Sequence, residues 1–375
     1  MKIVFAGGGT GGHFYPIIAV TEEINKIADK DKILENKLYF LSNSPYDGKA
    51  LSENGIEFMP ITAGKLRLYF SFQNFLDLFK TFFGTIGAIL KLYSIFPDVV
   101  FSKGGYLSFP VVLSARILGI PVVIHESDSV PGRVNIWTGK FAKRIAISYQ
   151  EAAKYFPREK TAWTGQPIRR DLKIPEKEGA FEYLKLDPGV PVIFILGGSQ
   201  GADRLNNAII DILPEILPKY QIIHQVGVKL LDEVNERLLV SLAKNEYKDR
   251  YHPFGFLNSL AMKMAAGASS LVISRAGSTI FEIASWQKPS IIVPIPESIS
   301  RDQTKNALSY AGTGACIVIE ETNLTPHILT AEINNIMENN TKRELMAKKA
   351  GEFAHPDSAE KIAREIINIA MSHDQ

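Results

Sequence analysis

Short runs rich in Val, Ile and Phe alternate along the chain with longer segments that have helical periodicity. A continuous apolar run bounded by turn residues is typical of a strand that is buried on both faces, as in a parallel sheet. The repeated alternation predicts an α/β protein with two doubly wound domains. We expect strands at 2–8, 37–43, 97–105, 120–126 and 144–149, and again at 191–201, 220–227, 269–278, 289–295 and 314–320.

Prolines, glycines and charges cluster at 161–179, and this composition favours a hinge between the two halves. We therefore expect an N-terminal Rossmann-like domain at 1–163 and a second at 164–350. Residues 351–375 contain an amphipathic helix, which we expect to pack back on the N-terminal domain. Its apolar face consists of Ile362, Ile366, Ile367 and Ala370.

The amino-acid composition limits the classes of protein to which this chain can belong. The 375 residues are 46% hydrophobic and 22% charged, as expected for a folded globular chain. A single cysteine, Cys316, excludes an intramolecular disulfide and suits a reducing compartment. "MKIVFAGGG" predicts a first strand rather than a secretory signal. Residues 1–165 carry 19 Lys and Arg against 14 Asp and Glu. This excess is too small to indicate nucleic acid, but it fits an acidic surface or a phosphate-bearing partner.

The most apolar region, 65–96, is interrupted by Lys80 and Lys91, so it is too short to cross a bilayer. A helix over 72–93 has an apolar arc wider than one sheet-facing stripe requires. One alternative is a well-buried helix with an apolar loop. We favour a patch that binds an anionic membrane surface, because aromatics enter the lipid interface and lysines meet anionic headgroups. Its members would include Phe75, Phe79, Phe82, Lys80 and Lys91.

The segment "GGGTGGHFYP", 7–16, follows the first expected strand and contains Gly7-x-Gly9-x-x-Gly12. This spacing matches the dinucleotide fingerprint, but the second strand ends in Ser42 and Asn43 rather than in an acid, which disfavours nicotinamide binding. Such glycines still allow the backbone to approach a ligand, and the next helix presents free N–H groups. His13 lies where this glycine loop runs into the next helix. It could cap or pack the turn, but beside this loop we favour a functional role.

Similar loops follow other strands. In "ILGGSQGADRLN", 195–206, Ser199, Gln200 and Gly201 would open a helix and bind an anion, most simply a diphosphate. "FSKGGYLSFP" would start a helix close to a substrate. "SRAGSTIFEIASW", 274–286, would place Glu282 one turn beyond Ser278 and Thr279. That carboxylate could accept hydrogen bonds from a sugar diol, or it could simply complement the helix dipole.

"GGGTGGHFYP", "SKGGYLSFP", "HESDSVPGRVN", "GGSQGA", "SRAGSTIFEIA" and "RDQTKNA" occur in this order over nearly the whole chain. As an ordered set they resemble the MurG family of N-acetylglucosaminyltransferases. The resemblance implies a GT-B fold, with two Rossmann-like domains and a cleft between them. It also implies an inverting transfer from UDP-N-acetylglucosamine to the 4-hydroxyl of a lipid-diphosphate-linked muramoyl-pentapeptide, which is the lipid I to lipid II step of peptidoglycan synthesis. Such an enzyme is peripheral, on the cytoplasmic face of the bacterial membrane.

The same resemblance implies roles for individual residues. The first loop would lie near the donor diphosphate and the acceptor, Arg169 and Ser199 would bind phosphate, and a backbone group at Leu257 would bind uracil. Glu282 would bind ribose and Gln303 the donor sugar. Many members have asparagine where this chain has Asp128, and an aspartate cannot donate the hydrogen bonds of an amide. Asn135 would then take part of that role. The first-loop residues are Thr10, Gly11 and Gly12.

The transfer needs a base for the acceptor hydroxyl, and the sequence leaves its identity open. His13 is our first choice because of its near-neutral ordinary pKa; Glu126, Asp128 and His125 are rivals. No Asp-x-Asp pair follows a strand, so we expect neither a metal nor another cofactor. The alternatives are another GT-B enzyme, such as a UDP-GlcNAc 2-epimerase or a different glycosyltransferase, and a non-catalytic protein that binds nucleotide sugars.

Overall fold

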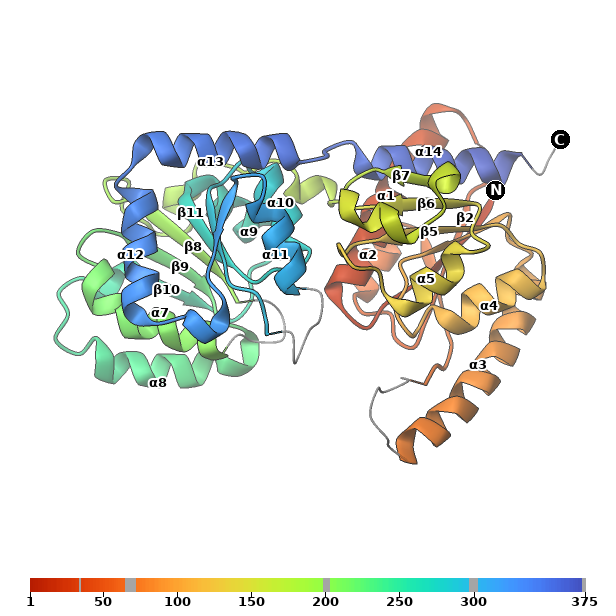
Figure 1. Ribbon diagram of the computed structural model, residues 1–375, viewed down its shortest axis with the longest axis horizontal. Helices are drawn as coiled ribbons and strands as arrows, with labels where there is room; N and C mark the ends of the chain where they lie inside the picture. The colour runs from red at the N-terminus through yellow and green to blue at the C-terminus, as the bar shows by residue number, and fades with distance from the viewer. Residues whose placement is uncertain (34, 65–71, 198–202, 297–302, 373–375) are drawn as a thin grey trace. The chain divides into compact units, whose positions relative to one another are not determined.

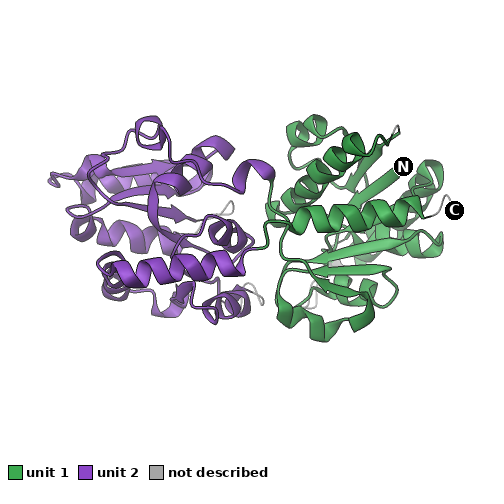
Figure 2. Cartoon of the chain, turned by 90° about the horizontal axis from the view of Figure 1, so that it is seen from above, with its two compact units in different colours: residues 1–169, 355–375 green, residues 170–354 purple. Residues whose placement is uncertain are grey.

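The structure is a computed structural model that describes residues 1–33, 35–64, 72–197, 203–296 and 303–372 (Figure 1). The chain divides into two compact units (Figure 2). Unit 1 comprises residues 1–169 and 355–375, and unit 2 comprises residues 170–354. Ser199, Gln200 and Gly201, like the 65–71 end of the apolar region, lie outside the described residues.

Unit 1 is built on a sheet of seven parallel strands in the order β3-β2-β1-β4-β5-β6-β7. The order reverses beside β1, which pairs with β2 on one side and with β4 on the other. The strands are β1 (Lys2–Ala6), β2 (Lys37–Ser42), β3 (Ile56–Pro60), β4 (Val99–Ser102), β5 (Val122–Glu126), β6 (Arg144–Ile147) and β7 (Thr161–Trp163).

Helices cover both faces of this sheet. One apolar core lies beneath α1 and α14, and the other beneath α3, α4 and α5. The expected apolar face of the last helix, including Ile362 and Ile366, is buried in the first of these cores. The helices of unit 1 are α1 (Gly11–Lys30), α2 (Gly48–Glu53), α3 (Phe72–Ile95), α4 (Phe109–Ile117), α5 (Arg133–Gly139) and α14 (Ser358–Met371).

Unit 2 repeats the plan with six parallel strands in the order β10-β9-β8-β11-β12-β13. Its strands are β8 (Val192–Leu196), β9 (Gln221–Gln225), β10 (Tyr251–Phe254), β11 (Ser269–Ser274), β12 (Ser290–Ile292) and β13 (Cys316–Val318). Its helices are α6 (Ala180–Tyr183), α7 (Asp203–Ile216), α8 (Leu231–Ser241), α9 (Ser259–Ala268), α10 (Thr279–Ser285), α11 (Gln303–Ala311), α12 (Pro326–Met337) and α13 (Asn340–Phe353).

All ten expected strands are present, although each is shorter than the apolar run that predicted it, and the two-domain α/β fold is confirmed. Three further strands, β3, β7 and β10, were not expected. Each lies at an edge of its sheet, and each is partly exposed. An edge strand needs no continuous apolar run, because it is not packed between neighbours on both sides.

Candidate functional site

The candidate site in unit 1 lies where the strand order reverses. The loop after β1 leads into α1 and the loop after β4 leads into α4, and these helices pack in different cores, on opposite faces of the sheet. Because β1 and β4 are parallel neighbours, their carboxyl ends lie side by side at this edge. Open α/β sheets bind ligands at such a point, which we call the opening. The loop after β5 lies next in line.

The first loop requires its glycines for physical reasons. Gly8 has φ +123°, and a Cβ there would lie 2.5 Å from Ser42 Oγ. The backbone is therefore held against the end of β2, where only glycine fits without strain. Thr10 precedes α1, and its Oγ1 lies 3.0 Å from His13 Nδ1. This contact fixes the imidazole at the opening, beside Gly105 of the β4 loop.

The pKa of His13 is lowered to about 4, first by burial and then by the positive charge of Lys103. At neutral pH the ring is therefore uncharged and has one nitrogen free of a proton. A neutral imidazole can accept a proton from a hydroxyl group, whereas an imidazolium cannot. The geometry thus permits His13 to act as a base, although its low pKa makes it a weak one.

Glu126 organises the β5 loop. Its Oε1 accepts a hydrogen bond from Asp128 N (2.9 Å), and its Oε2 accepts from Gly132 N (3.0 Å) and Asn135 Nδ2 (2.9 Å). Burial raises the pKa of this carboxyl, and the nearby Asp128 raises it further. Because both oxygens already accept hydrogen bonds, the geometry favours a loop-holding role for Glu126 over that of a base.

Asn135 is 3% exposed, and it packs against the β4 loop. Its Nδ2 donates to His125 O (3.2 Å) as well as to Glu126. Gly104 has φ +77°, and a Cβ there would lie 2.7 Å from the amide of Asn135. The amide hydrogens of Asn135 are thus already engaged within the loop.

His125 is fully buried, so it does not reach the opening. Its Nε2 lies 3.0 Å from Gly165 O, and a carbonyl oxygen can only accept, so Nε2 carries the proton. Burial lowers the pKa of His125 well below its ordinary value, so the ring is neutral and Nδ1 is an acceptor. That acceptor receives a hydrogen bond from Lys103 Nζ.

Among the predicted site residues of unit 1, the charged side chains of Asp128 and Arg169 are partly exposed. The Asp128 side chain is partly exposed, next to the loop anchored by Glu126. The guanidinium carbon of Arg169 lies 4.0 Å from the centre of the Tyr15 ring, within the range of a cation–π interaction. Tyr15 is on the first turns of α1, close to Gly11. Arg169 is thereby placed near the first glycine loop.

The strand order in the sheet of unit 2 reverses between β8 and β11, so the candidate site of this unit lies at the carboxyl ends of these strands. On the other side of β8 lie β9 and then β10. In the loop after β10, Leu257 N donates to Oε1 of Gln225, the last residue of β9 (3.1 Å). Asn258 then caps α9, its side chain accepting from Ala261 N at 2.9 Å. Phe256 is 64% exposed beside this turn. An exposed aromatic ring next to fixed backbone groups suits a planar base. Phe256 lies outside the motifs that the sequence pattern predicted for the site.

The loop after β11 places Ser278, Thr279 and Glu282 on the first turn of α10, all partly exposed. In the same loop, Arg275 Nη2 lies 2.6 Å from Glu321 Oε2, and its Nη1 donates to Val293 O (3.2 Å). Gln303 begins α11, and its Oε1 accepts from Ile295 N at 3.1 Å. This edge of unit 2 therefore offers hydroxyls, an amide and a carboxylate around one internal ion pair.

The structure brings together His13, Glu126, Asp128 and Asn135 in unit 1, together with one residue that was not singled out, Lys103. The sequence signal that could have identified Lys103 is its place between the run Val99–Ser102, which is apolar except for its last residue, and two glycines, where an ordinary surface lysine is not expected. Within the described residues, no group of three His, Cys, Asp or Glu side chains could hold a metal ion.

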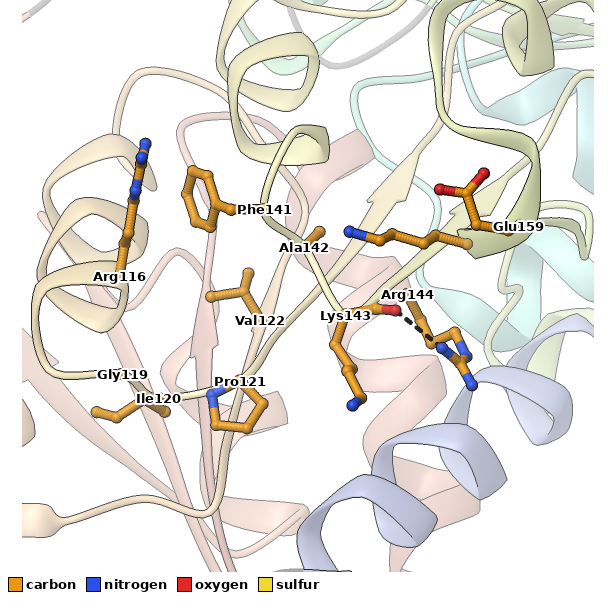
Figure 3. Close-up of a pocket in the computed structure, with 11 residues that line it drawn as sticks. Arg116, Gly119, Ile120, Pro121, Val122, Phe141, Ala142, Lys143, Arg144 and Glu159 are labelled. Carbon is orange, nitrogen blue, oxygen red and sulfur yellow. Dashed lines mark hydrogen bonds between the residues drawn. The ribbon is translucent and has the colours of Figure 1, made fainter.

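Unit 1 also contains a pocket of about 620 Å³, and Figure 3 shows the residues that line it. It is lined by the first residues of β5 and β6, Val122 and Arg144, and by Glu159 before β7. It therefore opens at the amino edge of the sheet, opposite the glycine loops. We place the site at the loops, since the chemically suited groups converge there.

The helix labelled α3 in Figure 1 was expected to have a wide apolar arc, and its side chains bear this out. Its inner side, with Ala88, Leu92 and Ile95, is buried. No helix of the described chain has the length and apolarity to cross a bilayer. Lys80 Nζ lies 3.2 Å from Asp77 on the same helix, so part of its charge is compensated. The outer side is exposed at Phe75, Phe79, Phe82, Phe83, Ile86, Leu90 and Tyr93.

Comparison with known proteins covers both units. The N-terminal domain of glycosyltransferase family 28 matches residues 3–147, and the C-terminal domain of that family matches residues 192–362. A Bacillus cereus UDP-N-acetylglucosamine–N-acetylmuramyl-(pentapeptide) pyrophosphoryl-undecaprenol N-acetylglucosamine transferase is 35% identical over 350 residues, or 93% of this chain and 95% of that protein.

Among solved structures, Acinetobacter baumannii MurG has a TM-score of 0.73 and 25% identity, covering 98% of this chain and 99% of its own. A UDP-GlcNAc 2-epimerase from Neisseria meningitidis, bound to UDP-GlcNAc, has a TM-score of 0.65 and 15% identity, covering 98% of this chain and 100% of its own. The second likeness shows a shared fold and no more.

Proposed function

Because this chain belongs to the MurG family of N-acetylglucosaminyltransferases, we propose that it transfers N-acetylglucosamine from UDP-GlcNAc to the 4-hydroxyl of a lipid-diphosphate-linked muramoyl-pentapeptide. The enzyme is thus a hexosyltransferase of peptidoglycan synthesis. The observation that carries the proposal is 35% identity over 93% of the chain to a transferase of that name. The identity extends over both units, so it includes the candidate site of each unit.

The reaction forms one bond and breaks another. The acceptor oxygen attacks the anomeric carbon of the sugar, the bond from that carbon to the diphosphate oxygen breaks, and UDP leaves with the electron pair. The hydroxyl proton passes to a base of the protein, for which His13 is our candidate. Its support is a neutral ring at the opening of unit 1, held by Thr10.

Unit 2 holds the donor in this proposal. The exposed ring of Phe256 and the fixed turn at Leu257 suit uracil, and Glu282 suits the ribose diol. Ser199, Gln200 and Gly201 remain our candidates for the diphosphate, with the N-terminal end of α7 and Arg169 stabilising the charge that develops. Gln303 would contact the donor sugar. Metal independence stays a prediction, and it is tested by turnover in EDTA.

The lipid-linked acceptor suggests where the enzyme works. We propose a peripheral position at the cytoplasmic face of the cell membrane, with the outer side of α3 in the lipid interface. Its support is the exposed stripe of Phe75, Phe79 and Phe82, because large aromatic rings on one helix face are typical of interfacial binding. Lys91 lies partly buried on the same helix, where its ammonium can meet anionic headgroups.

A transfer assay tests the function directly. Labelled UDP-GlcNAc is incubated with the enzyme, with and without a lipid-diphosphate muramoyl-pentapeptide, and the products are separated. We expect labelled disaccharide lipid only when the acceptor is present. Conversion of UDP-GlcNAc without acceptor would indicate an epimerase instead. Binding of UDP without turnover in either arm would indicate a non-catalytic protein.

A further inference from the structure

Glu321 is a buried carboxylate of unit 2 to which the proposed function assigns no role. It begins the short 3₁₀ helix Glu321–Asn323, which follows β13, and its side chain is only 6% exposed. A carboxylate buried to this extent is destabilising unless cations and hydrogen bonds compensate its charge. Glu321 therefore needs partners from other elements of the unit.

Two arginines from separate elements meet at this carboxylate. Arg275 follows β11 directly, and its Nη2 lies 2.6 Å from Glu321 Oε2. Arg204 is the second residue of α7, and its Nη1 lies 3.4 Å from Glu321 Oε1. Each oxygen of Glu321 thus faces a different arginine. The carboxylate thereby links the start of α7 to the loop that leads into α10.

The two arms of this link differ in how firmly they are held. Arg275 is 11% exposed, and its Nη1 also donates to Val293 O, just after β12, at 3.2 Å. Arg204 is 66% exposed, so water screens its attraction to Glu321. The Glu321–Arg275 pair is therefore a fixed point, and the exposed Arg204 is attached to it.

The first turns of α7 are also held on the opposite side of β8. Asn206 is 2% exposed, and its Nδ2 donates to Val226 O at 3.0 Å, just after β9. Its Oδ1 lies 3.1 Å from His224 Nε2 on β9, and since an amide oxygen can only accept, Nε2 carries the proton. These neutral contacts fix α7 toward β9, whereas Glu321 fixes it toward β13 at the other end of the strand order.

The charge of Arg204 is unusual for its place in the helix. The free N–H groups give the start of a helix a partial positive charge, which favours an acidic side chain such as that of Asp203 and disfavours a cation. The carboxylate of Glu321 offsets this repulsion. The guanidinium of Arg204 is thus explained by its contact with Glu321 rather than by helix formation.

We propose that Glu321 is a positioning residue that holds Arg204 and Arg275 together and so sets the spacing between the start of α7 and the loop into α10. The inference rests on the proposed function, in which the first segment receives the donor diphosphate and the second, through Glu282, the ribose. Both groups belong to one UDP molecule, so the two segments bind it tightly only when their spacing is fixed in advance. The contact should therefore act on donor affinity and not on the chemical step.

The test is Glu321→Gln, which keeps the size of the side chain but removes its charge. We expect the KM for UDP-GlcNAc and the calorimetric Kd for UDP to rise by about tenfold, with kcat nearly unchanged, because both arginines lose their charged partner. The matched control is Glu338→Gln, which breaks an exposed ion pair of the same unit, with Lys219 at 2.7 Å. The control should leave both constants unchanged. An unchanged KM and Kd in Glu321→Gln, or a fall in kcat alone, would overturn the proposal.

A second variant leaves the buried pair intact. Arg204→Met removes only the exposed arm of the link, and we expect it to raise the Kd for UDP by about threefold. Combined with Glu321→Gln it should cause no further rise, because the link is already broken. Rises that multiply would mean that Arg204 acts independently of Glu321 and would contradict the proposal.

The binding measurement separates this inference from the proposed reaction. A wild-type enzyme that bound UDP but transferred no sugar would overturn the proposed function, whereas the calorimetric cycle of Arg204 and Glu321 would still decide the positioning role. A wild-type enzyme that bound no UDP would overturn both.

Discussion

The two sheets end in chemically different edges, although their strand orders follow one plan. At the edge of unit 1, the imidazole of His13, the ammonium of Lys103 and the carboxyl of Glu126 all have pKa values displaced by burial. At the edge of unit 2, the largely buried cation Arg275 is directly paired with Glu321 at 2.6 Å, and Arg204 lies 3.4 Å from the same carboxylate. The predicted donor-binding groups described there are hydroxyls, an amide and the Glu282 carboxylate.

This difference separates two kinds of work. Displaced pKa values are typical of groups that move protons, whereas fixed hydrogen-bonding groups and paired charges are typical of binding. In the proposed function, unit 1 activates the acceptor hydroxyl and unit 2 holds the donor. One fold can serve both proposed roles, because the loops after the strands, and not the sheet, determine the chemistry.

The largest expected effect comes from removing the His13 imidazole, which tests whether the loop edge of unit 1 differs from that of unit 2 in its chemistry. His13→Ala should lower kcat by about 100-fold or more, since loss of a general base typically costs that much. Calorimetric titration with UDP should give an unchanged Kd, because the nucleotide is assigned to unit 2. Near-normal turnover would remove His13 as the base and leave Asp128, the more accessible carboxylate, as the remaining candidate.

The positions of the loops that form the two edges could be predicted from the sequence, whereas most of the contacts within them could not. Glycine loops after apolar strands predicted the edges, and the buried strands were found because both of their faces are apolar. The edge strands β3, β7 and β10 were missed, since their alternation is weak. Lys103 was missed for a different reason. Its partners Ser127 and His125 are more than 20 residues away in sequence, so the local pattern of a lysine between a strand and two glycines does not identify them.

The apolar surfaces of the units offer the next comparison. Replacing Phe75, Phe79 and Phe82 with Ser should weaken binding to anionic vesicles by about 30-fold. Full burial of one large apolar side chain is worth roughly 1.5–3 kcal/mol, so even partial insertion of three rings gives such a change. Co-sedimentation measures the binding. The matched control is Leu239→Ser with Val240→Ser on α8 of unit 2, where both side chains are exposed. Equal losses in the two variants would contradict a membrane role for α3.

A smaller effect on the kinetics should follow from a change at Glu282 in unit 2, the unit proposed to bind the donor. Glu282→Gln keeps the size of the side chain but removes the charge that would accept hydrogen bonds from the ribose diol. We expect the KM for UDP-GlcNAc to rise by about tenfold with kcat nearly unchanged, since a hydrogen bond to a charged group is worth about 1.5–3 kcal/mol. A change in KM with kcat nearly constant is the reverse of the result expected for His13→Ala, which should lower kcat. A fall in kcat with constant KM would move Glu282 from binding to chemistry.

The smallest effect concerns stability rather than turnover. Because the pKa of His13 is lowered to about 4 in the folded protein from an ordinary 6.5, protonation favours the unfolded chain. The stability that depends on the neutral ring is therefore complete above about pH 6.5 and is lost as the pH falls through about 4. Hydrogen exchange of α1 amides, compared between the wild type and His13→Asn, isolates this contribution from that of Glu126. The wild type should lose about 1–2 kcal/mol relative to the variant over this range, less than the full shift implies, because the ring is only partly buried. Parallel curves would mean that His13 titrates normally, and unit 1 would then lose the displaced imidazole that distinguishes its edge from that of unit 2.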